Sequence, residues 1–254
     1  MKRLIGCVAL VVGLIAVSAR ATPILQLDFD DRTVQDAGPP PNTVAGFSQF
    51  LLPGTTASVT GSASNTYGSN VVTLAIFDSD APPNDTNGAM DDRDRTVPSN
   101  SPPLAQLYDD FVFVGGSAGT TGGLDVSITG LTPSTQYTVS LYAYDDAAGT
   151  GTRTATWTDG FSNAFLFQTS FTQLTPPTTD DQYKFSAVTS TDATGKLLIK
   201  GRRDLTNVSG ANSVYIDGLV IDDSVPEPTS AAALIMCATL VAGLRRRRSV
   251  RLTM

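Results

Sequence analysis

The sequence contains no histidine, and its two cysteines, Cys7 and Cys237, lie in apolar segments near the two ends. Without histidine the chain cannot build a Ser-His-Asp triad, a Cys-His pair, a His-ligated zinc site or a histidine general base. With no cysteine between the two apolar segments, the intervening residues cannot form a disulfide. Enzymatic options are therefore reduced mainly to carboxylate chemistry, and stability has to come from a β core, with bound metal as a further source.

Glutamate is also missing from residues 22–224, where all 23 acidic side chains are aspartate. Glycoside hydrolases place two carboxyl groups about 5–10 Å apart across a cleft, and many of them use glutamate as the proton donor. Nothing in the sequence selects a pair of aspartates for this role. We therefore expect a protein that is not an enzyme, with a secreted carbohydrate-active hydrolase that uses two aspartates as the alternative.

The first apolar segment has the layout of a secretory signal peptide. Lys2 and Arg3 precede an apolar run over Leu4–Val17, and Ala19-Arg20-Ala21 matches a small-residue cleavage site. We expect cleavage after Ala21 and export of the residues that follow.

The second apolar segment, Thr229–Leu244, has sixteen residues, lies behind the stretch VPEP and is followed by four arginines. It is slightly shorter than the roughly 20 residues that usually span a bilayer, and arginines after such a segment favour its cytoplasmic side. The sequence therefore predicts a stop-transfer helix with cytoplasmic arginines. These arginines are Arg245, Arg246, Arg247 and Arg248.

Residues 225–248 resemble the PEP-CTERM sorting signal of Gram-negative bacteria in composition, order and position, with Pro226, Glu227 and Pro228 as the motif. The resemblance implies recognition by an exosortase, a membrane transpeptidase that cuts near the motif. It also implies an association with exopolysaccharide and biofilm matrix at the cell surface. A permanent single-pass anchor is the alternative interpretation of the same residues.

The chain therefore divides into a signal peptide (residues 1–21), a body (22–224), the sorting signal (225–248) and a cytoplasmic end (249–254). Eight of the 17 basic residues and one of the 24 acidic residues lie outside the body, so the body carries 9 basic and 23 acidic side chains, a net charge of −14. This charge repels nucleic acid and anionic lipid. It suits an extracytoplasmic protein.

Helical periodicity is nearly absent from the body, and short β-rich runs are separated by clusters of Gly, Pro, Asn, Asp and Ser. Many short strands with frequent turns indicate an all-β sandwich or barrel. The polar, Pro-rich stretch from residue 82 to residue 103 predicts a long loop. The expected strands are 24–29, 44–51, 57–61, 71–77, 110–114, 124–129, 135–144, 152–158, 164–171, 183–188, 195–200 and 213–221.

One segment, Ile128–Asp146, resembles the turn-Tyr-strand segment of fibronectin type III domains, in which the tyrosine, here Tyr137, makes a corner hydrogen bond. At least four expected strands follow this one, whereas a fibronectin domain would have only one more. A jelly-roll-type antiparallel β-sandwich therefore fits better. Ser213–Asp223 resembles the last central strand of galactose-binding-like jelly rolls and carbohydrate-binding modules, which implies that it lies beside Leu25–Asp31.

The strand over residues 137–144 alternates strongly, and we expect it to form a hairpin with the strand over residues 152–158. In that register Trp157, the only tryptophan, lies opposite Val139 on the apolar face, which predicts a core residue rather than a sugar platform. The opposite face carries Tyr142 and Tyr144. They are the candidates for glycan contact if that face is open, and a second packed face or a solvated pair is the competing interpretation.

Two groups of aspartates could supply oxygen ligands to a structural calcium ion, which takes about six to eight of them. One lies in the loop from residue 77 to residue 95, whose spacing does not match an EF-hand. The other would form if the first and last strands pair. The competing interpretation is a solvated loop that Arg93 and Arg95 partly neutralise. The candidate ligands are Asp78, Asp80, Asp85, Asp91, Asp28, Asp30 and Asp222.

Together these observations predict an exported protein of the cell envelope or extracellular matrix, sorted by an exosortase-type enzyme and passing through the inner membrane. Its β-sandwich body would have no catalytic activity and would bind extracellular polysaccharide through an open surface. A purely structural or adhesive domain without a small ligand remains the third hypothesis.

Overall fold

A computed structural model of the chain describes residues 23–29, 43–53, 59, 61–77, 90–95, 105–114, 122–146, 151–204 and 213–223. All of them belong to one compact unit, Thr22–Ser224. The expected signal peptide, the motif Pro226-Glu227-Pro228 and the arginines 245–248 lie outside the described residues. Within the described part of the chain, no helix has the length and apolarity needed to cross a membrane.

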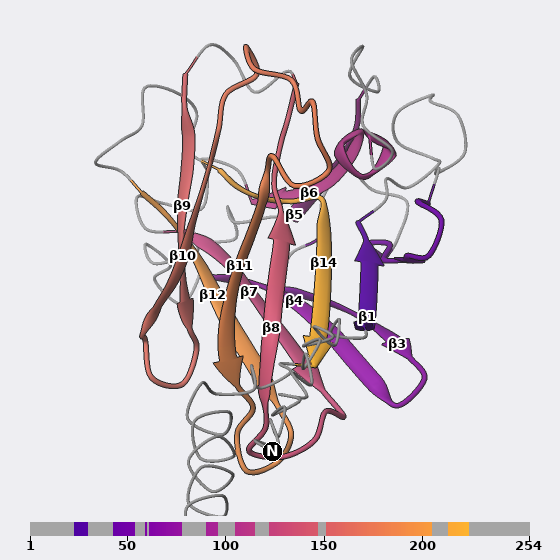
Figure 1. Ribbon diagram of the computed structural model, residues 1–254, viewed down its shortest axis with the longest axis vertical. Helices are drawn as coiled ribbons and strands as arrows, with labels where there is room; N and C mark the ends of the chain where they lie inside the picture. The colour runs from indigo at the N-terminus through magenta and orange to yellow at the C-terminus, as the bar shows by residue number, and fades with distance from the viewer. Residues whose placement is uncertain are drawn as a thin grey trace, which may run out of the picture. The chain divides into compact units, whose positions relative to one another are not determined.

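The body is all-β, with two large sheets. The strands of the five-stranded sheet, in spatial order, are β11 (Lys184–Ser190), β8 (Gln136–Tyr142), β14 (Gly218–Asp223), β1 (Pro23–Asp28) and β2 (Ser48–Gln49). Those of the six-stranded sheet are β10 (Phe165–Phe171), β9 (Arg153–Asp159), β12 (Leu197–Arg203), β7 (Gly123–Thr129), β4 (Asn70–Phe77) and β3 (Ser62–Tyr67). Figure 1 shows the strands of one sheet crossing in front of those of the other.

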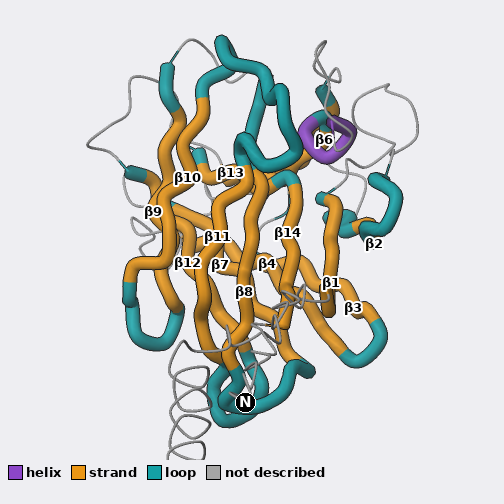
Figure 2. Tube along the Cα trace, viewed as in Figure 1, coloured by secondary structure: helices purple, strands orange, loops and turns teal. Residues whose placement is uncertain are grey.

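A small third sheet and one short helix complete the described body. The sheet contains β13 (Val214–Ile216), β6 (Asp110–Val114) and β5 (Met90–Asp94), and the 3₁₀ helix η1 covers Ala105–Tyr108. Among the described residues η1 is the only helix, as Figure 2 shows. Every strand pair is antiparallel except β1 with β2, which is parallel. The prediction of an all-β fold built from antiparallel sheets is confirmed.

The core forms because alternate residues of the strands point inward. In β12, Leu197 and Ile199 are buried, whereas Lys200 and Arg202 are only partly so. The same alternation buries Leu124, Val126 and Ile128 of β7 in one apolar cluster with residues of the five-stranded sheet. The two large sheets therefore share a continuous core, the arrangement of a β-sandwich.

The first and last strands pair, as expected. β1 lies antiparallel to β14 with Asp28 opposite Gly218, and β8 lies on the other side of β14. β14 is therefore a central strand, buried on both faces over most of its length. The turn before β8 also confirms the expected corner bond, because the Tyr137 hydroxyl accepts a hydrogen bond of 3.0 Å from the backbone N–H of Thr132.

Several expectations about local structure were wrong. The strand expected over residues 44–51 is limited to β2, β3 was not expected, and the single strand expected over residues 213–221 is divided between β13 and β14. The stretch from residue 82 to residue 103 is not a continuous loop, because Met90–Asp94 forms β5 at the edge of β6. β8 and β9 do not form a hairpin either. β8 pairs with β11 and β14, and β9 pairs with β10 and β12 in the other sheet. Strand partners depend on non-local packing that alternation along one segment does not reveal.

Candidate functional site

The two tyrosines expected on an open face are buried. Tyr142 is 3% exposed and Tyr144 is fully buried. Tyr108 of η1 packs edge-on against both rings, with centroids 6.1 Å away in each case. Burial raises the pKa of both hydroxyls, so they stay neutral. This face is a second packed face because η1 covers it, and the prediction of glycan contact at Tyr142 and Tyr144 is wrong.

Trp157 lies in the core, as expected, although in a different setting. It is fully buried on β9, its ring packs near Phe167, and its indole N–H donates to the hydroxyl of Thr169 at 3.3 Å. Its partner strands are β10 and β12 rather than β8. The tryptophan is therefore no platform for a sugar.

The aspartates expected to meet at the first and last strands are separated by the strand register. Asp28 lies opposite Gly218, whereas Asp222 lies opposite Pro23 at the other end of the same strand pair. Asp91 lies in β5, where Arg93 contacts it at 3.2 Å. The neighbouring Arg95 instead contacts Asp145 at 2.9 Å. Asp30, Asp78, Asp80 and Asp85 lie outside the described residues, so calcium binding by them stays a prediction.

Seven aspartates among the described residues are buried. Asp217, between β13 and β14, is the most deeply placed, and one of its carboxylate oxygens accepts the Tyr144 N–H at 2.5 Å. No three acidic side chains among the described residues lie close enough to bind one metal ion. These residues therefore do not form a calcium site by themselves. The buried aspartates are Asp28, Asp92, Asp109, Asp110, Asp145, Asp159 and Asp217.

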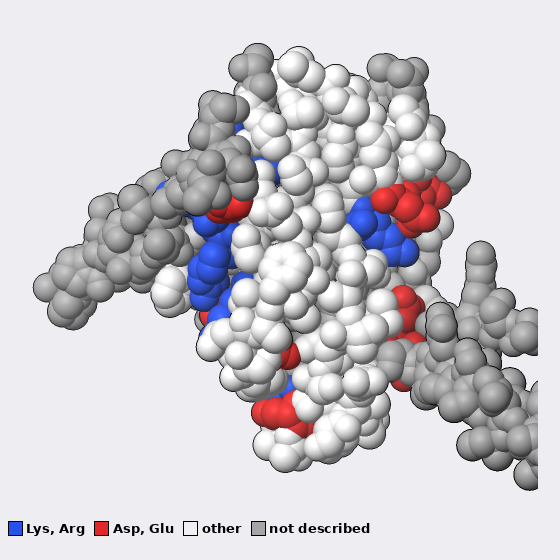
Figure 3. Space-filling view, turned by 60° about the vertical axis from the view of Figure 1, so that its left-hand side comes forward, with Lys and Arg blue, Asp and Glu red and all other residues white. Residues whose placement is uncertain are grey.

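A groove of about 540 Å³ opens on the side of the sandwich where β10, the edge of the six-stranded sheet, meets β11, the edge of the five-stranded sheet. We call it the edge groove. Figure 3 turns this side of the body toward the viewer, and most of the surface seen there is uncharged. Its principal lining residues are Asp159, Phe161, Phe165, Val188, Thr189 and Asp192.

Three apolar side chains of the edge groove face solvent. Phe161 is 46% exposed, Phe165 is 66% exposed and Val188 is 53% exposed. Phe165 lies two residues before the buried Phe167, so regular alternation along the strand would bury it as well. The β9–β10 register shifts between these two residues. A bulge of this kind re-aims side chains, which explains why an aromatic ring that alternation assigns to the core is exposed in the groove.

Asp159 holds the groove together. One oxygen accepts the N–H groups of Phe161 and Ser162, at 2.9 and 2.7 Å, and the other accepts the Thr189 hydroxyl of β11 at 2.5 Å. Partial burial alone would raise the pKa of Asp159, but these hydrogen bonds outweigh it and hold the pKa below its usual value. The ionised carboxylate thus fixes the turn that presents Phe161 and ties the two sheet edges together.

The second acidic residue of the groove, Asp192, closes the turn before β12. Its carboxylate accepts the backbone N–H of Lys196 at 2.9 Å and both the N–H and the hydroxyl of Thr194. These hydrogen bonds, led by that from Lys196, lower its pKa. A glycosidase needs one carboxyl group with a raised pKa as its proton donor. Neither Asp159 nor Asp192 has a raised pKa.

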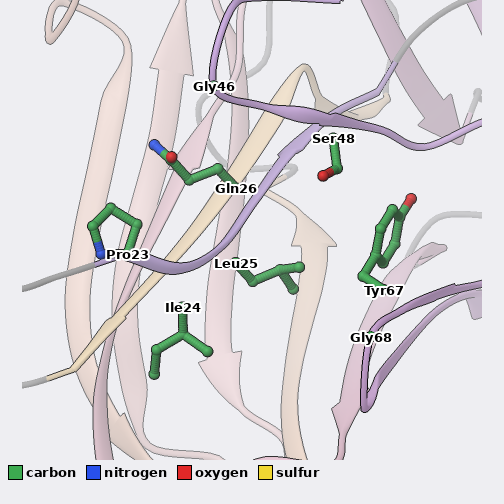
Figure 4. A pocket seen from close by; sticks show the side chains of 8 residues that line it. All are labelled: Pro23, Ile24, Leu25, Gln26, Gly46, Ser48, Tyr67 and Gly68. Carbon is green, nitrogen blue, oxygen red and sulfur yellow. The ribbon is translucent and has the colours of Figure 1, made fainter.

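A second hollow, of about 420 Å³, lies on the opposite side of the sandwich, beside β1, β2 and the β3–β4 turn. We call it the β1 hollow. Figure 4 shows the side chains of Gln26, Ser48 and Tyr67 around it, with Gly46 and Gly68 on two neighbouring turns. None of the described residues that line it is charged.

Neither hollow was predicted from the sequence. The two phenylalanines of the groove flank the turn Ser162-Asn163-Ala164, and only the bulge reveals their exposure. The residues of the β1 hollow come from segments that the fold brings together. An aromatic residue on each side of a short polar turn was the one signal available for the groove.

No known protein family matches the sequence, and no curated protein matches it either.

The backbone of this chain is similar over part of its length to several solved structures. The CBM22-1 and GH10 modules of endo-1,4-β-D-xylanase 10B from Clostridium thermocellum, complexed with xylohexaose, match with a TM-score of 0.36 and 11% identity over 60% of this chain and 26% of that chain. The K1 cleaved adhesin domain of Lys-gingipain from Porphyromonas gingivalis matches with a TM-score of 0.32 and 13% identity over 65% of this chain and 99% of that domain.

A carbohydrate-binding module in complex with β-1,4-galactotriose matches with a TM-score of 0.26 and 11% identity, over 57% of this chain and 86% of that module. The chain thus spans about a quarter of the xylanase structure and most of the two smaller domains. With TM-scores below 0.5, these similarities are too weak to assign a function. The fold of the chain, a β-sandwich, therefore rests on its own sheets.

Proposed function

We propose that this protein is an exported, non-enzymatic glycan-binding protein and that the edge groove is its binding surface. The observation that carries the proposal is the pair of exposed rings, Phe161 and Phe165, beside hydroxyl and carboxylate groups in an open groove. Apolar C–H faces of pyranose rings pack on aromatic rings, and sugar hydroxyls need a few placed polar groups, a combination typical of ligand sites.

The edge groove meets the requirements of a rigid site. Its two turns are fixed by the carboxylates of Asp159 and Asp192, so little conformational freedom is lost on binding. Exposed apolar side chains gathered in one place mark an interaction surface rather than ordinary surface composition. The lowered pKa values of both carboxylates support binding without hydrolysis.

Export and sorting belong to the same proposal, on the basis of the sequence alone. The signal peptide delivers the body across the inner membrane, and the PEP-CTERM-like tail presents Pro226, Glu227 and Pro228 to an exosortase-type transpeptidase. The mature protein then resides at the cell surface or in the extracellular matrix, where polysaccharide is its partner. The body is a galactose-binding-like jelly roll, which the pairing of β1 with β14 supports.

Phe165→Ala tests the groove. We expect the affinity of the full-length protein for its best neutral oligosaccharide to fall about tenfold, or about 1.4 kcal/mol, because the most exposed ring of the groove is lost. Isothermal titration with cello-, xylo- and galacto-oligosaccharides measures this change. The matched control is Leu174→Ala, because Leu174 is similarly exposed, at 68%, but does not line the groove. Equal affinity of wild type and Phe165→Ala would reject the groove as the site.

A further inference from the structure

The two hollows of the body occupy opposite lateral openings of the sandwich. The edge groove lies at β10 and β11, which are the first strands of the two sheet orders. The β1 hollow lies at β1, β2 and β3, at the far end of both orders. In Figure 1, β10 and β1 accordingly lie on opposite sides of the body. Ligands in the two hollows would therefore not compete for space.

The β1 hollow exists because β2 pairs only with the last residues of β1. β2 pairs with β1 only at Leu27 and Asp28. Just before β2, the chain turns at Gly46, whose φ of 94° lies in the left-handed region that favours glycine. The first residues of β1 therefore lack a neighbouring strand on this side among the described residues.

Backbone groups of β1 point toward β2 near the end of β1. The carbonyl of Asp28 points to the β2 side, because it accepts the N–H of Phe50 at 2.7 Å. Alternate residues of a strand direct their backbone groups to the same side, so those of Gln26 also point there. The β1–β14 register shifts between Pro23 and Leu25, which interrupts this alternation at Ile24.

Side chains add polar groups at separate points around the same space. The amide of Gln26 and the hydroxyl of Ser48 make no hydrogen bond with the described residues and are free to bind a ligand. The Tyr67 hydroxyl donates to the carbonyl of Gln49 at 2.7 Å, which holds its ring at the rim. The volume of about 420 Å³ falls within the range of roughly 300–1,000 Å³ that is usual for small-molecule sites.

We propose that the β1 hollow is a second saccharide site, which takes a neutral sugar residue, so that one molecule links two glycan chains. The Gln26 amide supplies both a donor and an acceptor, Ser48 a hydroxyl and Tyr67 a ring. The part of the lining that the structure describes offers no charged group to an acidic sugar. Binding in the hollow stands on this geometry alone. The linking of two chains also rests on the proposed function of the edge groove.

An extended peptide fits the same space less well. Strand addition draws its affinity from a run of main-chain hydrogen bonds. Pro23 has no N–H, and β2 already occupies the edge from Leu27 onward. The open edge of β1 is thus too short for a peptide strand, whereas a compact ligand rich in hydroxyls can use single polar groups.

Two variants test the hollow in the full-length protein. Gly68 lines it, has a φ of 60° and would place a Cβ in open space. Asparagine adopts this φ more readily than most residues, so Gly68→Asn fills the rim at a small cost in backbone strain, which the control below shares. Gln26→Leu removes the amide at similar size. The control is Gly61→Asn, because Gly61 also has a positive φ and open space but does not line the hollow.

Isothermal titration with the best neutral oligosaccharide is expected to give two bound molecules per wild-type chain. We expect one for Gly68→Asn, one for Gln26→Leu, one for Phe165→Ala and two for Gly61→Asn. Wild-type protein should also make a solution of the matching long polysaccharide turbid, and each single-site variant should lose this effect. Circular dichroism confirms that each variant is folded.

The outcomes separate the two proposals. A single bound molecule in wild type, unchanged by Gly68→Asn and Gln26→Leu, overturns the second site and leaves the edge groove in place. Loss of one molecule on Gln26→Leu with no effect of Phe165→Ala supports the hollow and rejects the groove. Two bound molecules in every variant would mean that neither hollow is a site, and no binding by wild type would reject both.

Discussion

At the scale of single residues, buried carboxylates play two different parts in this protein. Hydrogen bonds from the Ser162 N–H and from the Thr189 hydroxyl of β11 keep Asp159 ionised. Its carboxylate thereby organises the turn that follows β9. Asp217 is fully buried with one hydrogen bond to its carboxylate from the Tyr144 N–H. Burial is the largest cause that raises its pKa, and the carboxylates of Asp145, Asp28 and Asp110 add to it. In the folded protein Asp217 therefore stays protonated at pH values well above the ordinary pKa of an aspartate.

Asp217→Asn should therefore stabilise the protein at about pH 7, by about 1 kcal/mol. Above an ordinary aspartate pKa of about 3.9, the unfolded chain releases the Asp217 proton while the folded chain retains it. The contribution of this group to the free energy of unfolding consequently falls as pH rises toward its folded pKa. The gain from asparagine should be absent near pH 4 and grow as pH rises, which urea unfolding at several pH values measures.

A loss of stability in Asp217→Asn at neutral pH would contradict this prediction. Adding calcium or EDTA to both proteins separates the explanations. If the ionised carboxylate held a cation, the wild type alone would gain stability from calcium. If Asp217 is protonated, neither addition changes the difference between the two proteins.

The sequence predicted the environment of some side chains correctly and that of others wrongly. The core position of Trp157 was predicted correctly, although from a hairpin register that the structure does not have. The corner bond of Tyr137 was predicted from the resemblance to fibronectin type III domains. Tyr142 and Tyr144 were not, because η1 covers them from about 35 residues earlier in the chain. Whether a strand face is open depends on what packs on it, and alternation along the strand carries no such information.

At the scale of strands, β9 and β12 fit together through one glycine. A Cβ at Gly201 of β12 would come within 2.8 Å of the buried Trp157 ring of β9. We expect Gly201→Ala to destabilise the fold by about 1–3 kcal/mol, the usual cost of overpacking a core. Chemical denaturation of wild type and variant measures the change.

A double-mutant cycle tests the cause of this effect. Trp157→Phe should itself destabilise the protein, but it makes room for a methyl group at residue 201. Gly201→Ala should then cost much less in the Trp157→Phe background than in wild type. An equal cost in both backgrounds would place its origin in the backbone of β12 rather than in the contact.

The existence of strands was easier to predict than their partners. Asp110–Val114 was predicted with the bounds that β6 has, and β4, β7, β9 and β10 were predicted to within one residue at each end. β5 was missed because Met90–Asp94 contains four charged residues, so its sequence lacks apolar alternation. It is a strand because β6 offers an unpaired edge, which is a property of the fold and not of the segment.

At the scale of the whole molecule, the sorting prediction concerns the covalent form of the mature protein. We expect mass spectrometry of the surface protein to show a chain that begins near Thr22 and ends near the motif Pro226-Glu227-Pro228. Glu227→Ala should leave the tail attached, because the motif is what the transpeptidase would recognise. Peptides from residues 234–248 on the wild-type surface protein would contradict the cleavage prediction and favour a permanent anchor.

The pairing of β1 with β14 has a consequence for how the protein reaches its destination. Asp28 and Gly218 are adjacent in the sheet but 190 residues apart in the sequence. Contacts of such long range form late, because the chain between them must first be available. A chain emerging from a ribosome or a translocation pore cannot close its central sheet until nearly all of the body has emerged. The order of its strands therefore delays closure of the five-stranded sheet, so the proposed export would carry an unfolded chain across the membrane.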